Sequence, residues 1–579
     1  MILSLLQVLV FLEMKPKMQS VSCNSRRFSW AHTLGMGVLR LAGAACVTLL
    51  VCLQGSPAAA DPVAVLNGRV IDARTGTLLP ARVSIRDSAG EWFFPRCVSA
   101  EGTAVDYQRN RKGSPAMHTT LSADPFMVRL PPGKYTVTAQ RGKEYLPVER
   151  EVVVEADSTD IVLPLVRWIH MARLGWYSGD THSHRSLAET PNLVLAEDLN
   201  LSFPLSHWVG EGRVSPVKGN RVSAPAPQPG PIKVDDDHLV YPLNTEYELG
   251  GIGGRRHALG AVLIIGHKTL FHQGAPPVAP VAEQAHREGA LLDFEKHSWS
   301  WSLMLAPVMK VDLFELSNNH VWPGPFQLGK WTFEMNPAYM RVATDQNGYT
   351  EWGWIDYGFQ TYYAVLNCGF RIQPTAGTGS GAHPVPLGFG RVYVQQSDGF
   401  SYENWIEGLK AGRSFVTTGP MLLATVNGKP AGHIFVSAST GGVYRVAGRV
   451  ESRFPVDRVE IVVNGLVIRT LKPRGERTLD EGLRTLFSAD VSLTGSGWIA
   501  VRTFTRHPAS RSRFAHTSPW HVEVADHPLK PRAEEVDYIV GHLDRELRRH
   551  QGILEPASLA EFKAALEFYR ALEVNASAN

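Results

Sequence analysis

Residues 175–186 of the chain read GWYSGDTHSHRS, a run that predicts a strand bearing metal-binding side chains. Alternate residues of a strand point to the same face of a sheet, so Asp180, His182 and His184 are expected to share one face. Two imidazoles at this spacing can bind one metal ion, or two adjacent ions, at about 2.0–2.1 Å from each nitrogen. Taken alone, an H-x-H pair is weak evidence, because packed histidines explain most such pairs.

Further histidines and carboxylates recur along the chain after this run. They stand at the ends of strand-like runs or in a glycine-rich loop, at His207, Glu246, His257, His297 and His383. In a parallel barrel the strand ends form one face, where side chains from different strands converge. The series therefore favours a metal cluster over a set of separately packed structural histidines.

Residues 169–420 have the texture of an α/β domain. Strand-like runs such as AVLIIG and VDLFELS alternate with helical stretches such as PVAEQAHREGA. Residues 221–238, RVSAPAPQPGPIKVDDDH, are too rich in proline and polar residues for either element and predict an inserted loop. The run Asp235–Asp237 followed by His238 is interpreted as a solvated acidic loop rather than a second metal site.

β-rich texture flanks this region on both sides. Residues 61–168 predict a β-sandwich, and residues 421–526 predict a second β-rich domain in which Asn464-Gly465 favours a type I′ hairpin turn. Residues 527–579 predict a helical tail, with Ser558 and Glu561 as a capping box for its second helix. The fold class expected is thus multidomain, α/β plus β.

Residues 1–60 have the pattern of a signal peptide. Arg26 and Arg27 precede an apolar stretch of about 15 residues, which ends in SPAAADP, and cleavage is expected after Ala60. This predicts a periplasmic or secreted protein with no stable membrane span after cleavage of the leader. A retained N-terminal anchor is the alternative.

Composition limits the classes of partner and of structural framework that the chain is expected to have. The 58 basic and 55 acidic residues nearly balance, and no basic face stands out, so nucleic acid is not expected as a partner. Three of the five cysteines lie in the first 60 residues, and the remaining Cys97 and Cys368 are far apart, which excludes a disulfide scaffold or a zinc finger. No G-x-S-x-G elbow, P-loop or dinucleotide fingerprint is present.

The chain resembles a known superfamily over residues 170–420. GDTHSH, AEDLNLSFPLSH, the E-x(10)-H-x-L-G pattern from Glu246 to His257, VDLFELSNNH, and GTGSGAHPVPLGFGRVYV followed by WIEGLKAGRSFVTTGP are similar to motifs of the PHP (polymerase and histidinol phosphatase) superfamily, specifically its CehA/McbA-type metallohydrolases. Residues 61–168 resemble the carboxypeptidase regulatory-like domain, through the G-x-V-x-D start at Gly68, the turn Thr75-Gly76 and the P-x-G-x-Y-x-V strand from Pro131.

The resemblance implies a distorted β/α barrel that binds one to three divalent metal ions, zinc in the first place, with manganese or iron as alternatives. The metal ligands that it implies are His182, His184, His207, Glu246, His257, His297 and His383, with Glu189 near the position of a further ligand. Asp180 is expected to hold a ligand histidine, and His320 to act in catalysis. Glu315 and Asn319 share a strand end with His320 that lies near the site in the family.

Two positions depart from the family pattern. Ser206 precedes His207 where the family has an aspartate, and Gly381 stands where the family has an acidic metal ligand before His383. The metal nearest His383 is therefore expected to bind more weakly than its neighbours, or to be missing.

The function expected is an exported hydrolase in which a metal-bound hydroxide attacks an ester, amide, carbamate or phosphoester bond. The substrate would be a small molecule or a carbohydrate-linked compound. The alternative is a catalytically degenerate PHP-like protein with a cell-surface or carbohydrate-binding role.

Overall fold

A computed structural model describes residues 63–111, 113–219, 227–299, 301–325, 336–438 and 441–574. Residues 61–579 form one compact unit. The predicted leader lies outside the described residues, as does part of the proline-rich segment 221–238. Within the described ranges, no helix is long and apolar enough to span a membrane.

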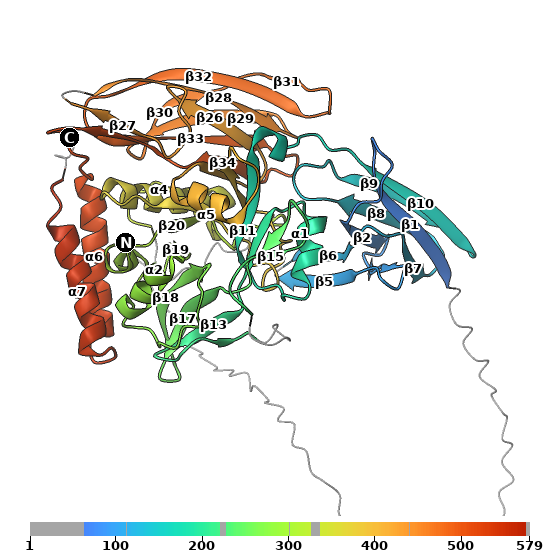
Figure 1. Ribbon diagram of the computed structural model, residues 1–579, viewed down its shortest axis with the longest axis horizontal. Coiled ribbons are helices and arrows are strands. Elements are labelled where there is room, and N and C mark those ends of the chain that lie inside the picture. The colour runs from blue at the N-terminus through green and yellow to red at the C-terminus, as the bar shows by residue number, and fades with distance from the viewer. Residues whose placement is uncertain are drawn as a thin grey trace, which may run out of the picture. The chain divides into compact units, whose positions relative to one another are not determined.

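The N-terminal region consists of two sheets that share one apolar core (Figure 1). The first sheet has the order β10-β1-β7-β4, with bounds Ser158–Leu165, Ala64–Asp72, Phe126–Leu130 and Arg96–Cys97. The second has the order β5-β6-β2-β8-β9, with β3 beside β2, and bounds Ala104–Arg111, Ser114–Leu121, Ala81–Asp87, Gly133–Gln140, Val148–Val154 and, for β3, Trp92–Phe93. Alternate residues of β1 and β8 are buried, which confirms the β-rich texture.

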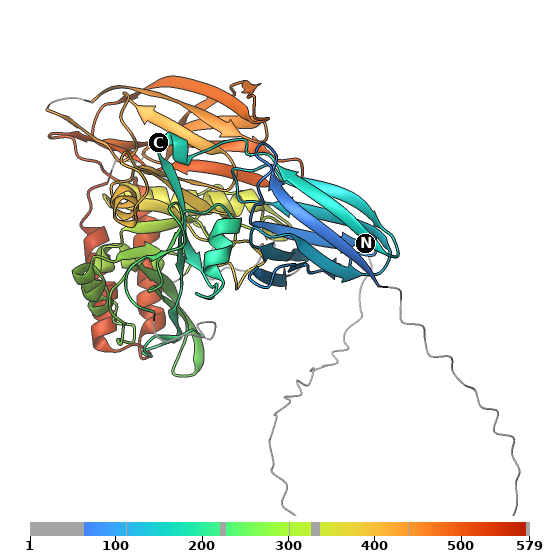
Figure 2. The same cartoon turned by 45° about the vertical axis from the view of Figure 1, so that its right-hand side comes forward.

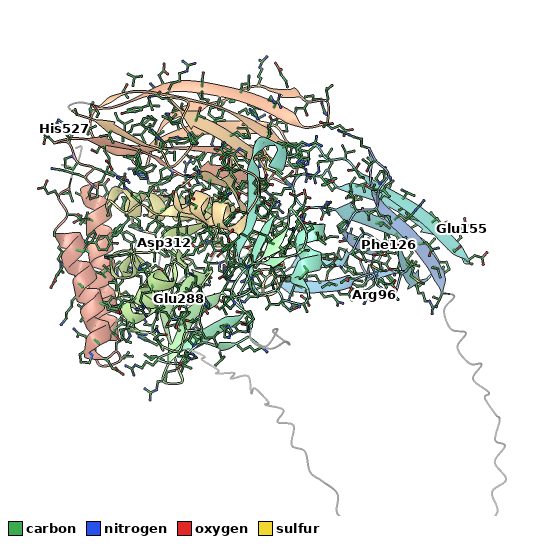
Figure 3. The ribbon with its side chains drawn as sticks, viewed as in Figure 1. Arg96, Phe126, Glu155, Glu288, Asp312 and His527 are labelled. Atoms are coloured by element: carbon green, nitrogen blue, oxygen red, sulfur yellow. The ribbon has the colours of Figure 1, made fainter. Side chains whose placement is uncertain are left out.

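Close packing in this core depends on one glycine. The ring of Phe126, labelled in Figure 3, lies where a side chain at Gly68 would be. A larger residue at Gly68 would displace that ring, so the G-x-V-x-D start of β1 reflects a packing requirement.

The central region contains a seven-stranded sheet that carries most of the site. Its order is β14-β13-β17-β18-β19-β20-β23, with bounds Val217–Lys218, His207–Gly212, Thr245–Ile252, Arg255–Ile265, Leu291–Phe294, Leu313–Ser317 and Gln373–Ala376. Strand β18 runs antiparallel to both of its neighbours, whereas β13–β17, β19–β20 and β20–β23 are parallel pairs. The sheet is therefore mixed.

Strand β11, Trp176–Ser183, contains His182 of the H-x-H pair, with His184 just after its end, and it belongs to a second, twelve-stranded sheet. It pairs in parallel with β12, Leu201–Pro204, and antiparallel with β24, Arg391–Gln395. The two sheets meet where the amides of Thr378 and Gly379 donate to the carbonyl of His182, at 3.1 and 2.8 Å. These two sheets form no closed barrel among the described strands, and β24 joins β11 to the C-terminal strands of the larger sheet.

The C-terminal strands complete the twelve-stranded sheet and form a further sheet of four. The larger sheet continues through β25, β34, β33, β29 and β30, at Ser414–Thr417, Ser512–Thr517, Gly497–Arg506, Val456–Val463 and Leu466–Leu471. Strand β35, Trp520–Val524, also pairs with β33, and β27, Ile434–Ser437, pairs with β35. The four-stranded sheet is β26-β28-β32-β31, at Met421–Val426, Gly442–Ser452, Leu483–Leu493 and Gly475–Arg477. Asn464 and Gly465 join β29 to β30 with φ of 49° and 84°, which confirms the predicted turn.

Short strands and helices complete the fold. Strands β15 and β16, Ile232–Lys233 and Leu239–Val240, extend the twelve-stranded sheet beyond β12, whereas β21 and β22, Thr344–Asp345 and Gly348–Tyr349, pair with each other. A 3-10 helix spans Ala172–Leu174. Helices α1 to α5 span Thr190–Ala196, Ala279–Glu288, Ser302–Met309, Glu351–Asn367 and Tyr402–Lys410. Helix α4 lies between β20 and the C-terminal sheet in both views (Figures 1 and 2), and Tyr363 contacts His516 of β34 at 2.8 Å.

The helical tail is confirmed as α6, Ala533–His550, and α7, Pro556–Arg570, which lie side by side (Figures 1 and 2). The predicted capping box is wrong, because the N-cap of α7 is Glu555 and Ser558 lies within the helix. Glu561 instead accepts the backbone amides of Val278 and Ala279, each at 2.8 Å, at the start of α2. Its carboxylate thus caps another helix.

Candidate metal centre

Strand β11 is buried along its whole length, and Asp180 anchors its C-terminal end. Asp180 Oδ1 accepts the amides of His182 and Thr378 at 3.1 and 3.2 Å, and Oδ2 accepts the Thr378 hydroxyl and the Gly388 amide at 2.6 and 2.9 Å. Burial raises the pKa of Asp180 to about 6, although these hydrogen bonds oppose the shift. The carboxylate therefore holds the backbone around His182 and is not part of the histidine and glutamate groups described next.

The first group joins β11 to β17. His182 Nε2 lies 3.2 Å from His184 Nε2, and His184 Nε2 lies 3.6 Å from Glu246 Oε2. One ligand atom from each of the three residues lies within 4.8 Å of the others, so the group could hold a metal ion. Glu246 and the neighbouring Trp208 stand opposite each other on the parallel strands β17 and β13, and the Trp208 ring lies 5.9 Å from the His184 ring.

The second group uses the other nitrogen of His182. His182 Nδ1 lies 3.2 Å from Glu315 Oε1 and 3.7 Å from Glu295 Oε1, and this triad could also hold a metal ion. Glu295 follows β19 directly, and Glu315 stands in the parallel neighbour β20. Asp312, labelled in Figure 3, accepts the Leu292 amide at 3.0 Å and so helps to hold these two strands in register.

The two groups concentrate negative charge in a buried volume. Burial and the neighbouring Glu295 raise the pKa of Glu246 and of Glu315 well above the usual range. Lys296 contacts Glu295 and lies 3.8 Å from Glu246, and its pKa is raised by the surrounding carboxylates in spite of its burial. One ammonium cannot balance three buried carboxylates, so further positive charge would stabilise them.

Two carboxylate oxygens of the cluster have no hydrogen-bond partner among the described residues. They are Glu246 Oε1 and Glu295 Oε2, and both are buried. Burial lowers the pKa of His182 well below its usual range, which keeps the imidazole neutral and able to act as a ligand. Neutral imidazoles and carboxylates are the donor set of zinc and related divalent ions, so the residues present fit such an ion.

The chemistry of imidazole limits how His182 can serve both groups. A neutral ring has one N–H and one acceptor nitrogen. If Nε2 binds an ion with His184 and Glu246, Nδ1–H donates to Glu315, an arrangement in which a carboxylate orients a ligand histidine. The first group is therefore the better ligand set, and Glu315 is its supporting carboxylate.

His320 and His383 form the rim of the cluster, with ring centroids 5.3 Å apart. Strand β5 of the N-terminal region reaches this rim: Arg111 donates to His383 Nδ1 at 2.9 Å, and Tyr107 donates to the His383 carbonyl. Gly381 has φ of 103° and donates its amide to the Tyr107 hydroxyl at 2.8 Å. The glycine thus meets a backbone requirement at a contact between two regions of the chain.

His207 and His257, both implied as ligands by the resemblance, belong to neither group. His207 pairs with Thr245 on the face of the sheet opposite Trp208 and Glu246, and its Nδ1 lies 3.0 Å from the Ser206 hydroxyl. His257 lies near the start of β18, where its Nε2 lies 2.8 Å from His550 Nδ1 of α6. Glu246 pairs with residue 263 of the same strand, about 20 Å along β18 at about 3.3 Å per residue.

His297 and Glu189 are also outside both groups. The His297 ring packs 4.8 Å from the rings of Trp354 and Tyr357, and burial lowers its pKa to about 3. Its Nδ1 lies 3.5 Å from the Asn318 side-chain nitrogen, and its buried Nε2 has no hydrogen-bond partner among the described residues. Glu189 stands at the start of α1 with a side chain 40% exposed, and its carboxylate lies 3.4 Å from Arg185 Nε.

Sequence reasoning missed Glu295 and Lys296, although both lie in the strand-like run LLDFEKH. Only the terminal His297 of this run is predicted as a metal ligand. Glu295 is two residues earlier, so in a regular strand it points to the same face as His297. The alternation within the run was the signal that could have identified it.

No family model and no curated protein matches the chain. Among solved structures, it is similar to the crystal structure of an engineered protein, with 11% identity over 41% of this chain and a TM-score of 0.12. The chain spans about half, 48%, of that engineered protein, and the similarity is too low to indicate a shared fold.

Proposed function

We propose that the protein is a metal-dependent hydrolase of the PHP superfamily, and that its two open sheets are a distorted form of that superfamily's barrel. The observation that carries the proposal is the sharing of His182 by two groups of buried imidazole and carboxylate donors. The H-x-H pair, Glu246, Glu295 and Glu315 come from separate elements, as is common where catalytic side chains converge at one face of a sheet.

In this proposal His182, His184 and Glu246 hold one divalent ion, zinc in the first place. A second ion beside Glu295 and Glu315 would use the remaining carboxylate oxygens. When bound, such an ion lowers the pKa of water toward about 7 and polarises the scissile carbonyl or phosphoryl oxygen.

The other residues of the site position and stabilise the proposed metal ligands. Asp180 fixes the backbone of His182 through the hydrogen bonds described above, and Glu315 orients the imidazole. Lys296 donates to Glu295, which keeps a positive charge beside the ligands. His320 stands at the rim beside His383, where an imidazole that first accepts a proton from water can pass that proton to a leaving group.

The test is hydrolysis of generic aryl esters, an aryl carbamate and aryl phosphoesters by purified protein, with and without added zinc or manganese. We expect turnover of at least one class that His184→Gln lowers more than 100-fold. His257→Gln is the matched control, because that histidine lies away from the cluster, and it should retain activity. Metal binding without turnover of any class would favour the alternative of a binding protein, and equal loss in both variants would contradict the proposed site.

A further inference from the structure

A cavity of about 220 Å³ lies apart from the histidine and glutamate cluster. Four regions of the chain line it: the N-terminal sheets, the loop after β20, the loop before β24 and the C-terminal strands. The side chains that matter for its chemistry are Arg82, Lys143, Phe389, Arg453, His507 and Arg513. None of the residues that line the cavity is acidic.

The positive charges of this cavity are only partly balanced. Arg82 forms an ion pair with Glu197 at 2.6 Å, and Arg513 lies 3.5 Å from Glu351. Lys143 donates to the Thr418 carbonyl at 2.9 Å, and this neutral acceptor does not balance the charge of the ammonium. Among the described residues, neither Lys143 nor Arg453 pairs with a carboxylate.

Two of the cations are held in place against an aromatic ring. The Lys143 ammonium lies 4.5 Å from the centre of the Phe389 ring, and the Arg513 guanidinium lies 5.0 Å from it. Cation–π contacts of this kind hold the side chains in place but leave their charge uncompensated.

The environment of Lys143 reflects this excess of positive charge. Burial lowers its pKa well below the usual range, and Arg391, Arg513 and Arg453 lower it further. Burial also lowers the pKa of Arg453. Buried or partly buried cations in this state gain from a bound anion, which acts as the missing counter-charge.

We propose that this cavity binds a tetrahedral oxyanion, phosphate or sulfate, either free or as the ester group of a small molecule. Guanidinium groups match the oxygens of such anions in bidentate geometry, and an ammonium adds a point charge. The volume corresponds to about seven water molecules at about 30 Å³ each, which exceeds the need of a bare oxyanion. A small substituent could therefore pack on Phe389.

The proposed anion site is independent of the metal proposal but lies close to the same loop. Phe389 follows Gly388, whose amide donates to Asp180 at 2.9 Å. Binding in the cavity therefore contacts the loop that supports Asp180, while none of the cavity residues belongs to the histidine and glutamate groups.

Isothermal titration calorimetry with inorganic phosphate, inorganic sulfate and glucose 6-phosphate tests the proposal at constant ionic strength. We expect saturable binding of one equivalent that Arg453→Gln and, separately, Lys143→Gln each weaken at least tenfold. Arg69→Gln, an exposed arginine on β1, is the matched control and should bind as the wild type does. Thermal unfolding establishes that each variant folds.

The ligands distinguish the sources of the anion. Tighter binding of the sugar phosphate than of inorganic phosphate would assign an ester, and the reverse would assign a free ion. His184→Gln should leave the binding unchanged, which separates this site from anions bound at a metal. Absence of saturable binding, or equal affinity in the wild type, Arg453→Gln and Lys143→Gln, would overturn the proposal.

Discussion

Replacement of Glu315 by glutamine tests how His182 is held. Glu315 is fully buried, and its two carboxylate oxygens lie 3.2 and 3.4 Å from His182 Nδ1. Glutamine is isosteric and its oxygen can still accept a hydrogen bond, but the negative charge that strengthens the ligand is lost. Loss of a supporting carboxylate of this kind costs about 10–100-fold in metal affinity, or about 1.4–2.7 kcal/mol.

Because the glutamine keeps a hydrogen bond, we expect the lower end of this range, about tenfold, for Glu315→Gln. Glu315→Ala removes both the charge and the acceptor, so about 100-fold is expected. The assay is competition for zinc against a chromophoric chelator, with the dissociation constant measured for each variant.

The matched control is Glu189→Gln, because this glutamate is partly exposed and its carboxylate pairs with Arg185. Its zinc affinity should equal that of the wild type. An unchanged dissociation constant for Glu315→Gln, with a loss in Glu189→Gln, would refute the account of His182 and restore the ligand implied by the resemblance.

Three further outcomes are expected. Gly377→Ala should lower the free energy of unfolding by about 1–3 kcal/mol and weaken metal binding, because its methyl group would overlap Glu315 Oε1 and His182 Cβ. Urea unfolding and the zinc competition assay measure these two effects, and unchanged values would contradict the packing. Burial lowers the pKa of His516 to about 3, so the folded state binds fewer protons than the unfolded state and loses stability as pH falls below about 6.5. At pH 5 the loss is about 2 kcal/mol, and the free energy of unfolding of His516→Gln, measured with urea, should lack that decrease between pH 7 and pH 5. Gly381→Asp should lower the free energy of unfolding by about 1–3 kcal/mol, because φ is 103° there, and an unaffected urea midpoint would show that the loop relaxes.

Local patterns predicted those parts of the fold that depend on neighbours in sequence. The alternation in β1 and β8, the Asn464-Gly465 turn and the two tail helices follow from periodicity and turn chemistry, and all are present. The pairing of β11 with β24 could not be predicted in this way, because it joins strands about 200 residues apart and depends on which sheet edge is available.

The site shows the same limit. The H-x-H pair was predicted from its spacing and Glu246 from its place in the series of strand-like runs, and these side chains do come together. His257 lies in β18, the strand that pairs with the strand of Glu246, but β18 runs antiparallel and places His257 at the opposite end of the strand pair. Strand direction, which the sequence pattern leaves open, therefore decided which of the predicted residues converge.

Metal analysis of the purified protein tests the central claim most directly. Inductively coupled plasma mass spectrometry should find one or two equivalents of a divalent transition metal in the wild type. His184→Gln and Glu246→Gln should each lose at least one equivalent, whereas His257→Gln should lose none. A wild-type protein that binds no divalent metal after incubation with zinc, manganese or iron, or equal metal content in all four proteins, would contradict the account.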